Sequence, residues 1–175
     1  AARQLTELID DLMDVSRIEA GELTVELSDV DVMAKLVSVV QLNEPLARRQ
    51  QVRLQMADGP AGPLLTRTDP VRLRQVLMNL VSNAIKYNRP GGEVRCHIRR
   101  EGGCVVAAVE DTGHGLTPAQ LSHLFEPFNR LGLERSTVEG HGVGLALAKR
   151  LVELQGGSIG VISAGFGFSD LIARH

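Results

Sequence analysis

The sequence predicts an α+β fold, an α/β sandwich in which a mixed β-sheet is layered with helices on one face and preceded by an N-terminal coiled-coil-like helix. Three observations predict it. The 175 residues suffice for one ordinary domain with a short appendage. Their composition, 43% hydrophobic and 23% charged, is typical of a globular protein. Segments with strand-like alternation and segments with helical periodicity both alternate and cluster along the chain.

Residues 2 to about 20 are expected to form an amphipathic helix that Gly21 ends. Its apolar residues recur at spacings of three and four: Leu5, Leu8, Ile9, Leu12, Val15 and Ile18. Such an apolar stripe must be buried against another element. Periodicity alone leaves two possibilities open: the helix packs on its own domain, or it is one part of a helical hairpin or dimer.

The remaining elements follow from alternation, capping residues and Gly/Pro breaks. Asp31 and Asp69-Pro70 are expected to cap helices that run to about residues 50 and 87, and Thr117-Pro118 opens a short helix. A further helix is expected over 142–155. Strands are expected at 23–27, 52–56, 64–68, 93–100, 104–110 and in a last hairpin over 158–173.

Composition excludes several function classes. The net charge of −2 and the 3% aromatic content argue against nucleic-acid binding. We find no apolar run near the roughly 18 residues of a membrane span, so no membrane contact by this fragment is expected. Cys96 and Cys104 flank a Gly-Gly turn without lying opposite each other, so a disulfide is not expected and a reducing, cytoplasmic location fits.

The helix after Asp69 carries an unusual polar stripe. At helical spacing, Arg72, Gln75, Asn79, Asn83 and Lys86 share one face, apart from an apolar face that forms core. The middle of the stripe is two amides, although Glu, Lys and Arg are better helix formers. An amide oxygen is a hard, neutral ligand suited to Mg²⁺ beside phosphates. The alternative is two surface asparagines without a role.

Two glycine clusters add to this stripe. Residues 111–115, DTGHG, follow a strand, so that Asp111 can accept a hydrogen bond from an exocyclic amine while the glycines let the backbone approach a planar ring. Residues 140–144, GHGVG, open a helix and offer backbone N–H groups to phosphate. Each motif alone is weak, and neither is the dinucleotide fingerprint or a P-loop.

Together and in this order, these motifs resemble the ATP-binding catalytic domain of bacterial sensor histidine kinases. NLVSNAIKY at 79–87 is similar to the asparagine box, DTGHG to the first glycine box, FEPFNR at 125–130 to the phenylalanine box, and the segment from 140 to the second glycine box. The N-terminal stretch resembles the end of the dimerisation and histidine-phosphotransfer hairpin. The resemblance therefore implies two parts: residues 1–20 from that hairpin and residues 21–175 as the kinase domain.

For the base of ATP, the resemblance implies that Asp111 accepts a hydrogen bond from the adenine amino group. Gly113 and Gly115 would bring the backbone against the base, and Tyr87 would pack near the nucleotide.

For the phosphates, the resemblance implies that Asn83 is the Mg²⁺ ligand, that Asn79 supports the metal or its waters, and that Lys86 reaches phosphate oxygens. The phosphates would be cradled by Gly140, Gly142 and Gly144, beneath a lid over 129–141, and Arg130 would contact the γ-phosphate or hold that lid. The cofactors implied are ATP and Mg²⁺.

The implied activity is transfer of the γ-phosphoryl group of ATP to a histidine and thence to a response regulator receiver domain. None of the five histidines lies in the family's acceptor motif, so this chain alone is expected to be inactive. A homodimer through the N-terminal helix is expected, in a cytoplasmic part of the parent protein, whose membrane anchoring the sequence leaves open.

Two alternatives stand beside this reading. One is a degenerate nucleotide-binding or dimerisation module without kinase activity. The other is a serine kinase of the anti-sigma-factor type, which would lack the N-terminal helix. The last strand also departs from the family's pattern, because Asp170 stands where a buried aromatic is usual, so its register or its order is open.

Overall fold

The computed structural model describes residues 2–57, 59–131, 142–163 and 169–174. Its helices are α1 (Ala2–Glu19), α2 (Val32–Arg49), α3 (Pro70–Lys86), α4 (Pro118–Ser122) and α5 (Gly144–Leu154). Its strands are β1 (Ser28–Asp31), β2 (Arg53–Met56), β3 (Leu65–Thr68), β4 (Glu93–Glu101), β5 (Cys104–Asp111), β6 (Ser158–Ser163) and β7 (Ser169–Arg174).

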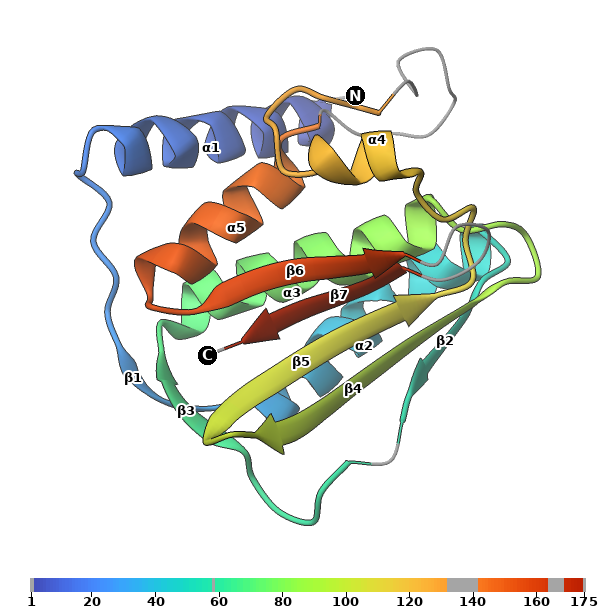
Figure 1. Cartoon of the computed structure of the whole chain (residues 1–175), viewed down its shortest axis with the longest axis horizontal. Coiled ribbons are helices and arrows are strands. Elements are labelled where there is room, and N and C mark those ends of the chain that lie inside the picture. The colour runs from blue at the N-terminus through green and yellow to red at the C-terminus, as the bar shows by residue number, and fades with distance from the viewer. Residues whose placement is uncertain (1, 58, 132–141, 164–168, 175) are drawn as a thin grey trace.

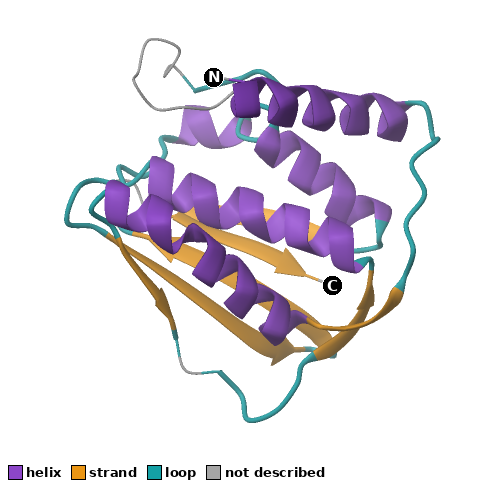
Figure 2. Cartoon of the chain, turned by 180° about the vertical axis from the view of Figure 1, so that it is seen from behind, coloured by secondary structure: helices purple, strands orange, loops and turns teal. Residues whose placement is uncertain are grey.

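The central sheet is mixed, as expected. Its five strands lie in the order β2-β4-β5-β7-β6, with β2 parallel to β4 and every other pair antiparallel. A separate two-stranded ribbon joins β1 to β3. Helices α2, α3 and α5 pack on one face of the sheet, and Figure 2 shows this helical layer in front of the strands. The predicted α+β class is therefore confirmed.

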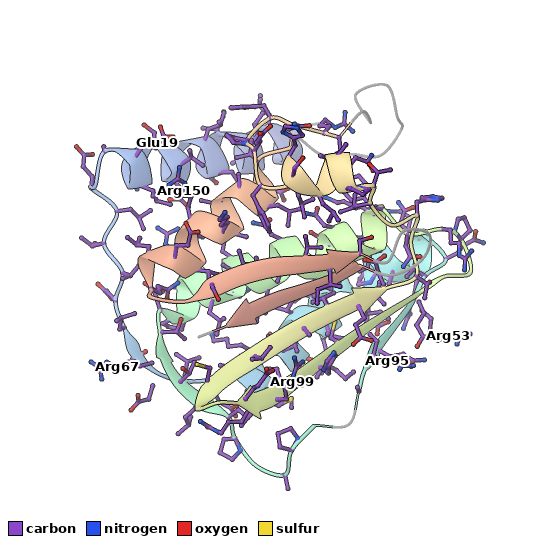
Figure 3. The ribbon with its side chains drawn as sticks, viewed as in Figure 1. Glu19, Arg53, Arg67, Arg95, Arg99 and Arg150 are labelled. Carbon is purple, nitrogen blue, oxygen red and sulfur yellow. The ribbon has the colours of Figure 1, made fainter. Side chains whose placement is uncertain are left out.

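The core lies between this helical layer and the inward face of the sheet. Leu36 of α2, Leu77 of α3 and Leu147 of α5 are fully buried there, together with Val94 and Val109 from β4 and β5. The alternate residues of β4 face the other way. Arg95 and Arg99 lie on that helix-free side (Figure 3) and pair along their own strand with Glu93 and Glu101, respectively.

Aspartates begin α2 and α3, two of the three helices that pack on the sheet. Asp31 accepts hydrogen bonds from the first turn of α2 at the Met33 and Ala34 N–H groups, and also from the Leu64 N–H at 3.2 Å. Asp69 accepts hydrogen bonds from the first turn of α3 at the Val71 and Arg72 N–H groups. Each carboxylate satisfies backbone donors that a helix start leaves without partners, which is why both starts could be predicted from the sequence.

The strand expected at 23–27 is wrong. No strand lies between Glu22 and Leu27, and the strand of this region is β1, which begins at Ser28. The Glu22 and Leu23 N–H groups bond to Arg17 O and close the end of α1, while the Glu26 N–H donates to the Asp69 carboxylate. Leu23 is buried and Val25 half-buried, as the alternation predicts, but Leu27 is 41% exposed. The backbone donors of this segment are used by a helix end and a side chain.

Helix α1 packs against α5 at the margin of the domain (Figure 1). Val15 and Ile18 lie against the core, whereas Leu5, Ile9 and Met13 remain 58%, 47% and 49% exposed. Part of the apolar surface of α1 therefore packs on its own domain. The rest, Leu5, Ile9 and Met13, forms an exposed row in which successive residues lie one helical turn apart.

The two cysteines are free, as expected. Cys96 lies opposite Val109, and Cys104 opposite Glu101. Cys96 is buried, and burial raises the pKa of its thiol to about 12. A thiol held neutral in this way is a packing residue.

The last hairpin is formed by β6 and β7. Strand β7 lies between β5 and β6, and β6 is an edge of the sheet. In β7, Asp170 lies in register with Glu110 on one side and Ile162 on the other. Residues 164–168, on which the atypical glycine-phenylalanine segment falls, lie outside the described residues.

Candidate functional site

Helix α3 carries the expected asparagine pair and is anchored at its start by Asp69. The Asp69 carboxylate accepts hydrogen bonds from the N–H groups of Glu26, Val71 and Arg72 at 2.9, 2.9 and 3.1 Å. Burial raises the pKa of Asp69, but these backbone donors and the charge of Arg72 outweigh burial and hold the pKa below its usual value. The carboxylate is therefore a charged anchor for the helix.

Asn83 lies half-buried one turn after Asn79. Within the described part of the chain, no hydrogen bond of its side-chain amide is found, so its oxygen is available to a ligand. Lys86 follows in the last turn and makes no ion pair with another described residue. Tyr87 is the C-cap, and its N–H donates to Asn83 O at 3.0 Å.

Asp111 ends β5 and is buried, with 7% of its surface exposed. Its Oδ1 accepts the Gly113 N–H at 2.8 Å. A Cβ atom on Gly113 would lie 2.7 Å from that oxygen and 2.8 Å from Tyr87 O. Glycine is therefore required here, because the loop after β5 passes in contact with both the carboxylate and the end of α3.

A second set of contacts fixes the same junction. Asn88 Nδ2 donates to Glu93 O at 3.0 Å, and Thr112 Oγ1 accepts the Glu93 N–H at 2.8 Å. The Thr112 N–H returns to Glu93 O at 3.0 Å. The end of α3, the start of β4 and the end of β5 are thus held together. Asn88 and Thr112 were not predicted as site residues, because their only signal in the sequence is their position beside the predicted motifs.

The start of α5 is bonded to α3 through the side chain of Asn79. Asn79 Nδ2 donates to Gly144 O at 3.0 Å. A Cβ on Gly144 would lie 3.1 Å from Asn79 Oδ1, so this glycine permits the close approach of the two helices. Asn79, Asn83, Asp111, Gly113 and Gly144 therefore lie on elements that meet.

For the other predicted site residues the structure shows fewer contacts, and some of them lie outside the described residues. Gly142 has a φ of +71° and its carbonyl accepts the Phe128 N–H at 2.9 Å, which brings the phenylalanine box beside α5. Gly115 also has a left-handed backbone, with φ +66°. Arg130 is half-buried nearby. Gly140 and most of the expected lid over 129–141 lie outside the described residues.

Phe128 itself was not singled out by the sequence. It has a φ of +64° and is 62% exposed, an uncommon pair of properties for a large apolar residue. Nothing in its neighbours along the chain indicates this backbone conformation.

The polar stripe of α3 is divided between two tasks, which its spacing did not predict. Arg72 Nη1 and Gln75 Nε2 both donate to Asp14 Oδ2 of α1, at 2.7 and 3.1 Å. Burial, together with the charge of Asp14, raises the pKa of Asp11 on the same helix, despite a hydrogen bond from Gln75. The first half of the stripe therefore holds α1, and the second half faces the predicted nucleotide site.

The donor set fits the implied ligands. Among the described residues no group of three or more His, Cys, Asp or Glu side chains could hold a metal ion. The available oxygen of Asn83 suits a Mg²⁺ ion that takes most of its ligands from phosphates and water. The base cradle is formed by the buried Asp111 carboxylate and the loop that Gly113 holds against it, and it suits a flat ring whose amino group faces a carboxylate. A Cβ on Gly113 would collide with that carboxylate and with Tyr87 O.

Comparison with known proteins identifies the class. The family model for Histidine kinase-, DNA gyrase B-, and HSP90-like ATPase matches residues 68–169, which include all the motifs described above. The chain belongs to this family. ATP is therefore the nucleotide of the domain.

The relatives narrow the class to sensor histidine kinases. The Circadian input-output histidine kinase CikA of Synechococcus elongatus is 37% identical over 166 residues, 93% of this chain and 22% of the relative. The chain spans 14% to 26% of the length of the curated relatives compared with it.

Solved structures agree. Full-length ShkA in complex with AMPPNP superposes with a TM-score of 0.82 at 29% identity, covering 97% of this chain and 35% of that one. The Acinetobacter baumannii histidine kinase AdeS has a TM-score of 0.80 at 23% identity, covering 99% of this chain and 78% of that one, and shows the shared fold. The resemblance to the ATP-binding domain of histidine kinases is confirmed.

Proposed function

We propose that this chain is the ATP-binding catalytic part of a two-component sensor histidine kinase. Residues 1–20 are the C-terminal part of its dimerisation and phosphotransfer hairpin, and residues 21–175 are the kinase domain. The observation that carries the proposal is the meeting of three motif-bearing elements: Gly113 contacts the end of α3, and Asn79 bonds to the first residue of α5. The relatives named as histidine kinases support the same activity.

The residues of the site act by binding and orienting. Asp111 accepts the adenine amino group, Gly113 and Gly115 bring the backbone against the ring, and Tyr87 packs beside the nucleotide. Asn83 contributes an amide oxygen to Mg²⁺, which neutralises phosphate charge when bound. Lys86 approaches the phosphate oxygens from the same helix. Gly142 and Gly144 lead into α5, whose first N–H groups favour phosphate. Gly140 and Arg130 complete the phosphate side.

The reaction transfers the γ-phosphoryl group to an imidazole nitrogen. The bond from the γ-phosphorus to the bridging oxygen breaks as the nitrogen–phosphorus bond forms, ADP leaves with the bridging oxygen, and the imidazole proton passes to solvent. Such a transfer depends on positioning and charge neutralisation. The acceptor is a histidine of the hairpin's other helix and not one of the five in this sequence.

The partners follow from the same assignment. The outward row Leu5, Ile9 and Met13 of α1 suits a helical partner in a homodimer, because these side chains are exposed along one face. The phosphoryl group passes next to an aspartate of a response regulator receiver domain. A location in the cytoplasm, where ATP is supplied, fits two free cysteines. No helix among the described residues is long and apolar enough to cross a membrane.

The test is transfer from γ-labelled ATP with and without an added hairpin fragment that carries the acceptor histidine. We expect acid-labile label on the added fragment and none on this chain alone, and Asn83→Ala should abolish the transfer. If the chain binds nucleotide but transfers no label either alone or with the added fragment, it is a degenerate binding module. Label on this chain alone would show that one of its own histidines is the acceptor.

A further inference from the structure

The side chain of Asn79 joins the helix that carries the predicted Mg²⁺ ligand to the helix that faces the phosphates. Its Nδ2 donates to Gly144 O at 3.0 Å, and its Oδ1 lies 3.1 Å from where a Cβ of Gly144 would stand. The Nδ2 end of this amide is therefore bonded to the first residue of α5, and its Oδ1 end lies beside the space that a side chain of that residue would take. Asn83, one turn later, has no such contact among the described residues.

Helix α5 needs this support because it begins without a capping side chain. Val143, the N-cap, has a helical backbone and makes no side-chain hydrogen bond to the first turn. The other end of α5 is tied to the start of α3, where Gln155 Oε1 accepts the Thr68 hydroxyl at 2.7 Å and the Asp69 N–H at 2.8 Å. Asn79 and Gln155 thus fix α5 against α3 at both ends.

The direction of the Asn79 amide decides between two roles. To offer its oxygen to a metal ion from the NH₂ position, the amide would have to turn over, which would place its oxygen against Gly144 O. Two acceptors would then face each other without a proton between them, and the hydrogen bond would be lost. The arrangement found favours a donor that holds α5.

We infer that Asn79 is a positioning residue, whose Nδ2 bond to Gly144 O fixes the phosphate-facing start of α5. This inference rests on the proposed function, since it assigns a role within the same nucleotide site. Gly144 is its counterpart, because any larger residue would push the Asn79 amide away. Asn83 remains the protein ligand of the metal.

Nucleotide titrations of the whole chain, with and without Mg²⁺, separate the two roles. Asn79→Ala should weaken ATP binding about fivefold under both conditions, the effect of one ordinary hydrogen bond. Asn79→Asp should weaken it further, because a carboxylate oxygen faces Gly144 O. Asn83→Ala is the matched control, which should lose the gain in affinity that Mg²⁺ brings and keep the affinity measured without Mg²⁺.

Gly144→Ala tests the contact from its other side. The added methyl group should weaken ATP binding in the wild-type background and cost little more when Asn79 is already alanine, because the smaller side chain leaves room. Such non-additivity is expected only for residues in contact. This cycle also keeps the inference testable if Asn79→Asp fails to fold.

Hydrogen exchange of the ligand-free protein gives a readout that does not depend on ATP. The Leu147 N–H, bonded to Val143 O at 2.9 Å, should exchange faster in Asn79→Ala and unchanged in Asn83→Ala. The inference is overturned if Asn79→Asp retains or increases the Mg²⁺-dependent gain, or if exchange at the start of α5 does not change. If the wild-type chain binds no ATP, the proposed function fails, while the exchange result still decides the role of Asn79.

Discussion

Replacing Gly113 by alanine tests whether the loop after β5 forms the base cradle. The new Cβ would lie 2.7 Å from Asp111 Oδ1 and 2.8 Å from Tyr87 O, whereas ordinary contact begins at 3.4 Å. The carboxylate would therefore have to move by about 0.7 Å and the carbonyl by about 0.6 Å. The carbonyl belongs to the backbone at the end of α3, so it cannot turn aside as a side chain could.

The expected cost has two parts. Overpacking of this kind costs about 1–3 kcal/mol of unfolding free energy. Moving Asp111 also weakens its bond from the Gly113 N–H, found at 2.8 Å, and a hydrogen bond to a charged group contributes about 1.5–3 kcal/mol. We expect a total loss of about 3 kcal/mol and, because Asp111 is displaced, at least a tenfold weaker binding of ADP.

Urea unfolding and calorimetric titration with ADP measure the two effects. Gly160→Ala is the matched control, because its Cβ would meet no heavy atom of the described residues within 4 Å, and both quantities should stay near those of the wild type. If Gly113→Ala binds ADP as well as the wild type and unfolds at the same urea concentration, the cradle described here is wrong.

Three further predictions concern helices α1 and α3. Asp14→Ala should remove about 1–3 kcal/mol of docking energy from α1, seen as faster hydrogen exchange in α1, whereas Asp10→Ala should not. The stability that Asp69 contributes should be full above pH 3.8, its unfolded value, and fall as the pH drops below it, because its pKa is lowered in the folded state; Asp69→Asn should lack this slope in acid unfolding. Asn83→Ala should change the melting temperature by less than about 2 °C, because its side chain is bound to no other described residue.

Local signals made much of the fold predictable. Asp31, Asp69 and Thr117 were recognised as helix starts because a capping side chain bonds to backbone within three residues of itself, and all three caps are present. The β4–β5 hairpin was predictable for a similar reason, since an alternating segment and a continuous apolar segment lie on either side of a Gly-Gly turn.

Contacts between distant segments could not be predicted in this way. Arg72 and Gln75 belong to the same spacing pattern as Asn83, yet they bind Asp14, which depends on how α1 docks. The segment before β1 has the alternation of a strand, but its Glu26 N–H is taken by Asp69, which lies 43 residues later. In both cases the partner is set by tertiary packing and leaves no trace in the neighbouring sequence.

For the candidate site, the sequence predicted which residues take part better than it predicted how they are arranged. The chemistry of Asn83 and Asp111 predicts their roles, and both lie on elements that meet, whereas the Asn79–Gly144 bond, which joins α3 to α5, had no sequence signal. The left-handed backbone of Phe128, whose N–H bonds to Gly142 O, also had no signal in the sequence.

The central claim is that Asp111 reads the adenine base of ATP. The most direct measurement is a pair of calorimetric titrations with ATP and GTP, in the presence of Mg²⁺, on the wild type and on Asp111→Asn. Guanine presents a carbonyl where adenine presents its amino group, so the carboxylate would face an acceptor, and we expect GTP to bind at least tenfold more weakly than ATP. Asp111→Asn should bind ATP much more weakly and lose most of this preference. Equal affinity of the wild type for ATP and GTP would contradict the account.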